Sequence, residues 1–115
     1  MKMNDAIDML SGLAQESRLK VFKELVKAHK PGVDEGGMAA GTLAGRLGVP
    51  APTLSFHLKE MSRAGLVTSR KNGRSVIYKA NLKAMNALVG YLLQDCCGGA
   101  CGVSIVSQSS EEVLQ

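Results

Sequence analysis

The chain has 115 residues, of which 45% are apolar and only 3% aromatic, and its formal net charge is +4. This length favours a single domain with an aliphatic core, and the scarcity of aromatic rings argues against a reader that stacks bases on an aromatic sheet. No apolar run reaches the ~18 residues that span a bilayer, and the first residues lack the pattern of a secretion signal. We therefore expect a cytoplasmic protein with no membrane partner.

Three helices are predicted in the first fifty residues. The first covers about residues 5–14, with Asn4 or Asp5 as its N-cap, and the second begins near Ser17. The apolar face of the second helix is expected to hold Leu19, Phe22, Leu25 and Val26. A polar, Gly-rich loop follows, and residues 42–47 form a short third helix that ends at a glycine.

The short helix, the glycine turn and the next helix together form a predicted helix-turn-helix over residues 42–65. Pro50 and Pro52 suit the start of its second helix, because their missing N–H groups would be unpaired there. At ~100° per residue, one face of this helix is apolar and the opposite face is basic and hydroxyl-bearing. His57 lies between the two faces and is expected to be a half-buried, hydrogen-bonded structural residue. The residues expected to contact DNA are Thr53, Ser55, Phe56, Lys59 and Arg63.

A basic hairpin is predicted over residues 66–80, where two β-prone runs flank an Asn-Gly pair. Residues 50–80 hold six basic residues and one acidic residue, a net charge of +5, whereas the rest of the chain carries −1. A solvated hairpin is the plainer interpretation, but a helix-turn-helix just upstream favours a wing that contacts DNA. The residues expected to make these contacts are Arg70, Lys71 and Arg74.

One motif carries a family resemblance. The pattern T-x-S-x-H-L-x-x-M-x-x-A-G-L-V runs from Thr53 to Val67. In it the chain strongly resembles the ArsR/SmtB family of bacterial metal-sensing repressors. The resemblance covers roughly residues 5–97 and implies a winged helix-turn-helix, mainly α with a small β-hairpin wing (α+β), in the order α-α-α-α-β-β-α. The chain departs from many members at Pro50 and Phe56, so the operator sequence is not predicted.

The resemblance also implies a homodimer that binds double-stranded operator DNA with an inverted repeat. Residues 1–97 would form the winged helix-turn-helix dimer domain, with dimer helices over residues 5–14 and 81–95. Residues 98–115 would form a thiol-bearing turn and a flexible tail. The expected dimer-interface residues are Ile7, Leu10, Leu82, Met85, Val89 and Leu92.

A thiol cluster, Cys96, Cys97 and Cys101, follows the last predicted helix. Neighbouring helix residues point ~100° apart, so these thiols converge only if the helix ends there, and Gly98 and Gly99 supply a break. Three thiols on one turn suit trivalent arsenic, which forms three pyramidal bonds to sulfur. The cluster is similar to that of an ArsR branch which responds to As(III) and Sb(III), some of whose relatives bind methylated arsenic. Binding of cadmium or lead and thiol oxidation stay open as alternatives.

We therefore expect a DNA-binding repressor of an arsenic-resistance operon, released when As(III), Sb(III) or methylarsenite binds the three cysteines, with no organic cofactor. The CxC motif and the last-helix histidines that other sensors of the family use are absent. A thiol reductase is the alternative from a different class. The chain has no C-x-x-C motif, no phosphate-binding glycine loop and no base near the thiols, so we expect no enzyme. A metal-buffering protein, the third possibility, would lack salt-dependent DNA affinity.

Overall fold

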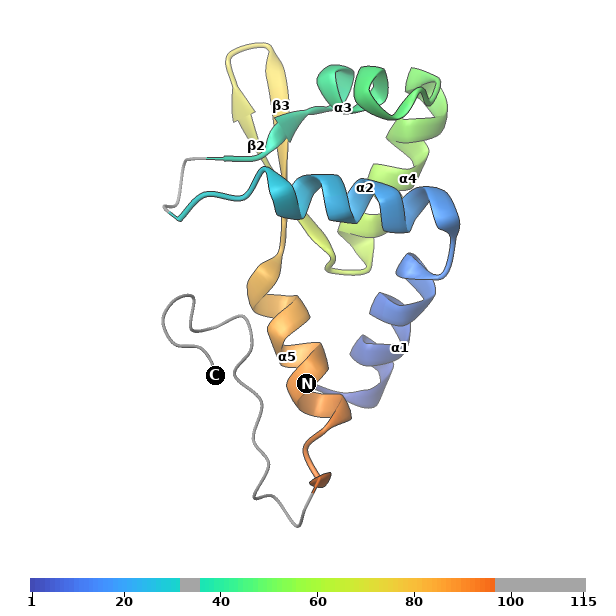
Figure 1. The fold of residues 1–115 in the computed structure, drawn as a ribbon, viewed down its shortest axis with the longest axis vertical. Coiled ribbons are helices and arrows are strands. Elements are labelled where there is room, and N and C mark those ends of the chain that lie inside the picture. Colours follow the sequence, from blue (N-terminus) through green and yellow to red (C-terminus); the bar gives the residue numbers. More distant parts are fainter. Residues whose placement is uncertain (32–35, 97–115) are drawn as a thin grey trace.

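The computed structural model describes residues 1–31 and 36–96, which form five helices and a three-stranded antiparallel sheet (Figure 1). The elements in chain order are α1 (Met3–Leu13), α2 (Glu16–Lys27), β1 (Met38–Ala39), α3 (Ala40–Leu47), α4 (Ala51–Arg63), β2 (Val67–Asn72), β3 (Ser75–Ala80) and α5 (Leu82–Leu92). This is the predicted mainly α architecture with a small β wing. Within the described residues, no helix is both long enough and apolar enough to cross a bilayer.

The predicted element order lacks one strand, β1, which precedes α3 and pairs with β3. The sheet order is therefore β1-β3-β2, and the hairpin strand β3 lies in the centre. Gly37 leads into β1 with φ 89°, and a Cβ there would lie 2.6 Å from the carbonyl oxygen of Tyr78. Only glycine permits both this backbone angle and this close approach. A strand of two residues shows no alternation of apolar and polar side chains, so the sequence pattern did not indicate it.

Several predicted helix boundaries are wrong by a few residues. The first helix starts at Met3 rather than near Asp5, and Asp5 is not its N-cap. The Asp5 carboxylate instead accepts a hydrogen bond from the backbone N–H of Lys2, the true N-cap, at 3.3 Å. The third helix begins at Ala40 instead of residue 42, and α5 ends at Leu92 instead of residue 95.

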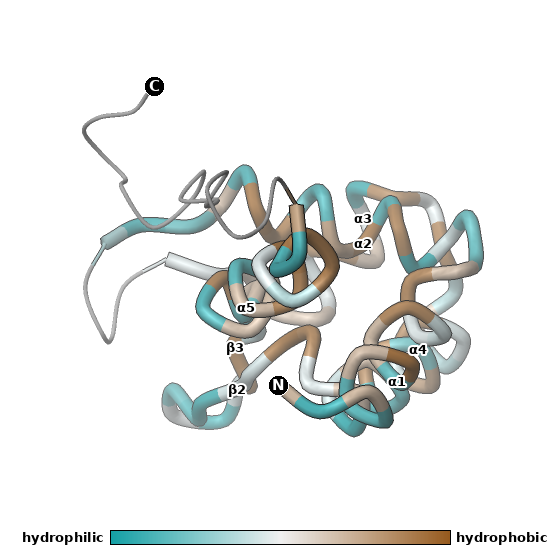
Figure 2. The backbone as a smooth tube through the Cα atoms, turned by 90° about the horizontal axis from the view of Figure 1, so that it is seen from below, coloured by the Kyte–Doolittle hydropathy of each residue, from teal (hydrophilic) through white to brown (hydrophobic). Residues whose placement is uncertain are grey.

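The core is aliphatic, as the composition predicts. Its fully buried side chains are Val21, Leu25, Leu43, Leu54, Leu58, Met61 and Leu66. The predicted apolar face of α2 is off by about one position, because Val21 is fully buried whereas Leu19 and Val26 are exposed. Along α2, apolar and polar residues alternate, the pattern of a helix that covers a core with one face (Figure 2).

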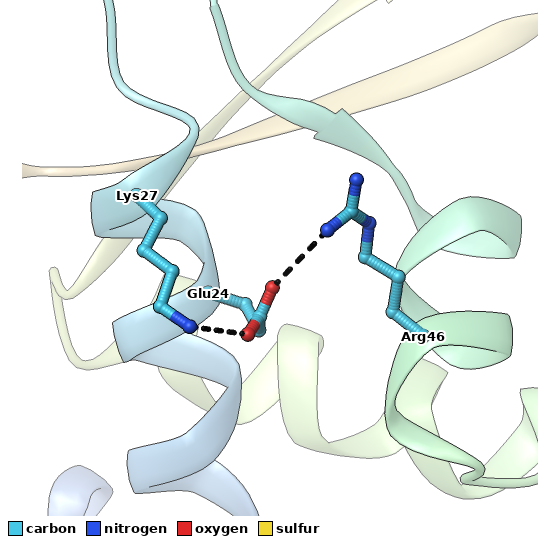
Figure 3. Close-up of polar contacts among 3 residues, drawn as sticks. All are labelled: Glu24, Lys27 and Arg46. Atoms are coloured by element: carbon cyan, nitrogen blue, oxygen red, sulfur yellow. Dashed lines mark hydrogen bonds and ion pairs between the residues drawn. The ribbon is translucent and has the colours of Figure 1, made fainter.

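The first helix of the helix-turn-helix, α3, is joined to α2 by a small ionic cluster on Glu24. The Glu24 carboxylate lies 3.1 Å from Nζ of Lys27 in its own helix and 3.8 Å from Nη1 of Arg46 in α3 (Figure 3). The cations are well exposed, so this cluster contributes little free energy compared with the buried leucines between the helices.

Candidate nucleic-acid interface

The turn between α3 and α4 is shaped by one glycine and two prolines. Gly48 ends α3 in the left-handed conformation, with φ 66°. Pro50 is the N-cap of α4, with φ −57° and ψ 141°, and Pro52 lies in the first turn, where the backbone has no use for another N–H donor. Local sequence chemistry therefore sets the abrupt change of direction that presents α4.

Helix α4 has the two faces that the sequence predicts. Leu54, Leu58 and Met61 are buried against the core. The predicted DNA-contacting residues are all exposed on the other side of the helix: Thr53, Ser55, Phe56, Lys59 and Arg63. The Phe56 ring is an unusual member of this set, because 57% of this large apolar side chain is accessible. An exposed ring amid hydroxyl and basic groups is suited to a base edge or a thymine methyl in the major groove.

Arg63, the last residue of α4, has a partner in the described structure. Its Nη2 lies 3.0 Å from Oε2 of Glu60, one turn earlier on the helix. The Arg63 side chain remains 71% exposed, so this ion pair is weak and a DNA phosphate can compete with the carboxylate for the guanidinium.

His57 faces inward from α4 and contacts a residue of another helix. Its Nδ1 accepts a hydrogen bond from Nε–H of Arg18, on α2, at 3.1 Å. This bond makes the neutral Nε2–H tautomer the one present, and burial followed by the Arg18 charge lowers the histidine pKa. The predicted structural role is confirmed, although His57 is more deeply buried than expected, with 7% of its surface accessible.

Arg18 is absent from the residues that the sequence predicts for this site. Its guanidinium carbon also lies 5.8 Å from the ring centroid of Phe56, so one side chain contacts two consecutive residues of α4. The available signal was the spacing of Arg18 from Val21, Phe22 and Leu25 at i+3, i+4 and i+7. A basic residue that occupies one position of a buried helical stripe requires a partner from a neighbouring element.

The wing is a tight hairpin whose three predicted basic residues lie in two different environments. The register pairs Asn72 with Ser75, and Gly73 in the turn has φ 66°. Lys71 and Arg74 are exposed near this turn. Arg70 is half-buried and donates from Nη2 to the carbonyl oxygen of Gly36 at 3.2 Å. The Arg70 side chain thus supports the segment that leads into β1, in addition to its predicted contact with DNA.

The predicted dimer residues also divide into two groups. Ile7, Leu10 and Leu92 are 44–55% exposed, and Met3 and Leu93 beside them are exposed as well. Leu82 and Met85 instead pack against the core, and Val89 is half-buried. Helices α1 and α5 lie together at the end of the molecule opposite the wing turn (Figure 1). They carry an apolar surface that a folded chain in water tends to cover.

The thiol cluster is described only in part. Cys96 is exposed and lies four residues beyond the end of α5, where its backbone N–H donates to the carbonyl oxygen of Leu93 at 2.9 Å. Cys97 and Cys101 lie outside the described residues. Among residues 1–31 and 36–96, no three His, Cys, Asp or Glu side chains gather as a metal site would require.

Comparison with known proteins assigns the chain to a family. Residues 13–70 match the helix-turn-helix domain family, about half of the chain. A solved ArsR-like transcriptional regulator from Rhodococcus sp. RHA1 has 27% identity and a TM-score of 0.67, with 79% of this chain and 77% of that chain covered. The chain belongs to the ArsR/SmtB family of winged helix-turn-helix regulators.

Two further proteins are similar to this chain. The nodulation protein NolR of Rhizobium meliloti is 30% identical over 87 residues, which are 76% of this chain. The match spans 65% of the length of NolR, so this chain matches less than two thirds of that relative. A crystal structure described as a possible transcriptional regulator for arsenical resistance has 27% identity and a TM-score of 0.58, with 76% of this chain and 86% of that chain covered.

Proposed function

We propose that this ArsR/SmtB protein is a homodimeric repressor of an arsenic-resistance operon, which leaves its operator DNA when As(III) binds Cys96, Cys97 and Cys101. One observation carries the proposal: three cysteines follow the point where α5 ends, at Leu92. Because the helix stops before Cys96, the regular 100° spacing of helical side chains does not hold that thiol apart from the two that follow.

The chemistry of three clustered thiols supports trivalent arsenic as the signal. Arsenous acid exchanges each of its three hydroxyl groups for a thiolate sulfur, each thiol proton leaves with a hydroxyl as water, and no electron is transferred. Antimonite reacts in the same way, and methylarsenite needs only two thiols. A structural zinc site would take a fourth protein ligand. The related structure described as a possible regulator for arsenical resistance adds support from outside the chain.

The DNA-binding part of the proposal is supported by the exposed face of α4 and by the wing. Lys59, Arg63, Lys71 and Arg74 are exposed basic residues on these two elements, and they can bind phosphate while the small α4 residues Thr53 and Ser55 approach base edges. The exposed apolar residues of α1 and α5 support a two-fold dimer, which places two recognition helices in successive major grooves.

The test is a fluorescence anisotropy titration of the full chain on an inverted-repeat duplex selected from a random library. As(III), Sb(III), Zn(II), Cd(II), Pb(II) and peroxide are compared at equal concentration. We expect As(III) and Sb(III) to release the DNA and Zn(II) to leave it bound. If cadmium, lead or peroxide releases the DNA and arsenite does not, the signal is that agent and not arsenic.

The matched variant replaces all three cysteines with serine, which keeps the size and removes the thiol. We expect it to bind the duplex with the affinity of the wild-type protein and to ignore arsenite. A triple serine variant that still leaves the DNA in arsenite would place the sensor elsewhere in the chain. A turnover assay with arsenate and a dithiol reductant covers the enzyme alternative, and measurable turnover would contradict a purely regulatory role.

A further inference from the structure

We propose that Arg18, which lies on α2 outside the helix-turn-helix, is a positioning residue that sets the base preference of α4 by holding the exposed Phe56 ring. The inference rests on DNA binding by α4, as in the proposed function, and is independent of the arsenic response. Helix α2 thereby contributes to the recognition of DNA sequence by α4.

The geometry joins one guanidinium to two residues that point in different directions. Nε–H of Arg18 donates to Nδ1 of His57 at 3.1 Å, on the buried side of α4. The Arg18 guanidinium carbon lies 5.8 Å from the centroid of the Phe56 ring, on the exposed side. Consecutive helix residues point ~100° apart, so the guanidinium occupies the corner between the core and the DNA-facing surface.

The hydrogen bond to His57 holds the Arg18 guanidinium in a position from which it can orient the Phe56 ring. Arg18 is half-buried and His57 is 7% exposed, so the bond between them is partly shielded from water and restrains the position of the guanidinium. A planar cation held beside an aromatic ring attracts it and limits the orientations it takes. The ring is 57% exposed, and its other ring contact within the described residues is the tilted His57 imidazole, whose centroid lies 6.3 Å away, so the cation is a main influence on its orientation.

The surroundings of Arg18 favour a positioning role over a direct contact with phosphate. Asp8 of α1 and Glu60 of α4 line, together with Arg18 and Arg63, a pocket of about 220 Å³. The two carboxylates of this pocket offset the charges of Arg18 and Arg63, and Nε of Arg18 is already engaged with His57. The Phe56 ring is the group on the DNA side that Arg18 contacts.

Thymine provides a probe of the ring position, because its C5 methyl group in the major groove is what an apolar side chain contacts. Replacing thymine with deoxyuridine removes only this methyl group. The ratio of affinities for the two duplexes therefore reports how well the ring is placed. A change that merely lowers the folded population of the protein reduces both affinities and leaves the ratio unchanged.

The experiment first selects binding sites for the wild-type protein from a random duplex library, without arsenic. The thymine-to-deoxyuridine ratio is then measured at each thymine of the selected site for wild type, Arg18→Lys, Arg18→Met and Phe56→Ala. We expect Phe56→Ala to abolish the preference at one thymine per half-site. Both Arg18 variants should reduce the same ratio roughly two- to fivefold, while binding to unrelated duplex DNA stays close to wild type.

Two further variants serve as controls. Lys20→Met removes a positive charge two residues away on α2, from a side chain paired with Glu16, and should leave the ratio unchanged. His57→Asn keeps an acceptor oxygen near the place of Nδ1 but removes the imidazole ring that lies 6.3 Å from the Phe56 ring. It should retain most of the ratio if the guanidinium orients Phe56, and a ratio lost in this variant but kept in Arg18→Lys would assign that role to the imidazole instead.

The outcomes separate the alternatives. A wild-type ratio in Arg18→Lys would overturn the proposal, because charge alone would then suffice. A shallower salt dependence in Arg18→Met with an unchanged ratio would make Arg18 a phosphate contact instead. A wild-type protein indifferent to every thymine methyl would also overturn it. A wild-type protein that binds no duplex would contradict the proposed function itself, whereas specific binding with an unaltered ratio would contradict only the role of Arg18.

Discussion

The side chain of Asn81 donates from Nδ2 to the carbonyl oxygen of Gly65 at 3.1 Å. This bond joins the N-cap of α5 to the glycine that follows α4, while Oδ1 of Asn81 accepts from the backbone N–H of Ala84 at 3.1 Å and caps the helix. One side chain thus connects the helix that precedes the cysteines with the helix that carries the predicted DNA contacts. We expect a shift at the start of α5 to reach the end of α4 through this bond.

Replacing Asn81 separates its two roles. Asn81→Ala removes both bonds and should lower the free energy of unfolding by about 1–2 kcal/mol. Asn81→Ser keeps a capping oxygen but is too short to reach Gly65, so it should cost less than the alanine variant. Urea unfolding measures both. If Asn81→Ser both binds the operator and releases it in arsenite as the wild-type protein does, the bond to Gly65 does not couple arsenite binding to DNA release.

Arsenite and operator DNA must affect each other equally if both bind the same dimer. When arsenite weakens DNA binding by a given factor, the operator weakens arsenite binding by that same factor, because the two routes to the doubly bound state have the same free energy. Competition with a chromophoric dithiol, with and without a saturating selected duplex, measures the second factor. Unequal factors at equilibrium would show that arsenite removes the protein by another route, such as aggregation.

The buried His57 makes stability depend on pH. Burial and the Arg18 charge lower its pKa in the folded protein, whereas the unfolded chain has the ordinary value near 6.5. Below about pH 6.5 the unfolded state binds a proton that the folded state does not, so the free energy of unfolding falls as the pH decreases toward the folded-state pKa. The slope from this group is at most about 1.4 kcal/mol per pH unit. The free energy of unfolding, measured with urea from pH 8 to pH 5, should depend less on pH for His57→Asn than for wild type. Equal pH dependence in the two proteins would exclude His57 as the cause.

Gly12 allows α1 to pack closely against the residues after α4. A Cβ at this position would lie 2.8 Å from Cδ1 of Leu66 and 3.1 Å from Cβ of Ala64. Leu66 is fully buried and has little room to move, so Gly12→Ala should destabilise the fold by about 1–3 kcal/mol. Gly45→Ala, in α3, is the matched control, because an added Cβ at this position would have no atom within 4 Å. It should stabilise the protein by about 0.5–1 kcal/mol, through helix propensity alone. Thermal unfolding that shows the same sign for both variants would contradict this packing.

The exposed apolar surface of α1 and α5 predicts the effect of a charge on dimer formation. Leu10→Glu places a carboxylate in the proposed interface and should weaken the dimer by about 2 kcal/mol, or roughly 30-fold. Leu19→Glu is matched in exposure, 47% against 44%, but lies on α2 outside the predicted interface. Sedimentation velocity across a concentration series should show more monomer only for the first variant. An equal effect of both would place the interface elsewhere or make the association non-specific.

Elements with strong local signals could be predicted from the sequence, and elements that depend on distant partners could not. Gly48, Pro50 and Pro52 act within their own turn, so the helix-turn-helix was predictable from these residues. The Asn-Gly pair likewise indicated the hairpin, but the register differs by one residue: Asn72 pairs with Ser75, and the two-residue turn is Gly73-Arg74. Strand β1 has only Met38 and Ala39 and exists because β3 offers it an edge, so no local pattern indicates it.

The same distinction holds at the candidate site. The exposed face of α4 was predictable because helical periodicity alone separates it from Leu54, Leu58 and Met61. The contact of Arg18 with His57 was not, because it joins residues 39 positions apart and depends on the packing of α2 against α4. Likewise, Leu82 and Leu92 belong to one apolar stripe of α5, yet Leu82 packs against the core and Leu92 is exposed. This difference was not predictable, because periodicity does not say which neighbour covers a position.

The division of α4 into two faces has a consequence for how such a regulator acquires new target genes. The side chains that hold the helix in the fold, such as Leu58, are buried, and those predicted to meet DNA, such as Ser55, are exposed. Substitutions at exposed positions usually change stability by less than about 0.5 kcal/mol. Operator preference can therefore drift, or be redesigned, without loss of the folded scaffold or of the thiols beyond α5. The same sensor could in this way be placed in control of a different promoter.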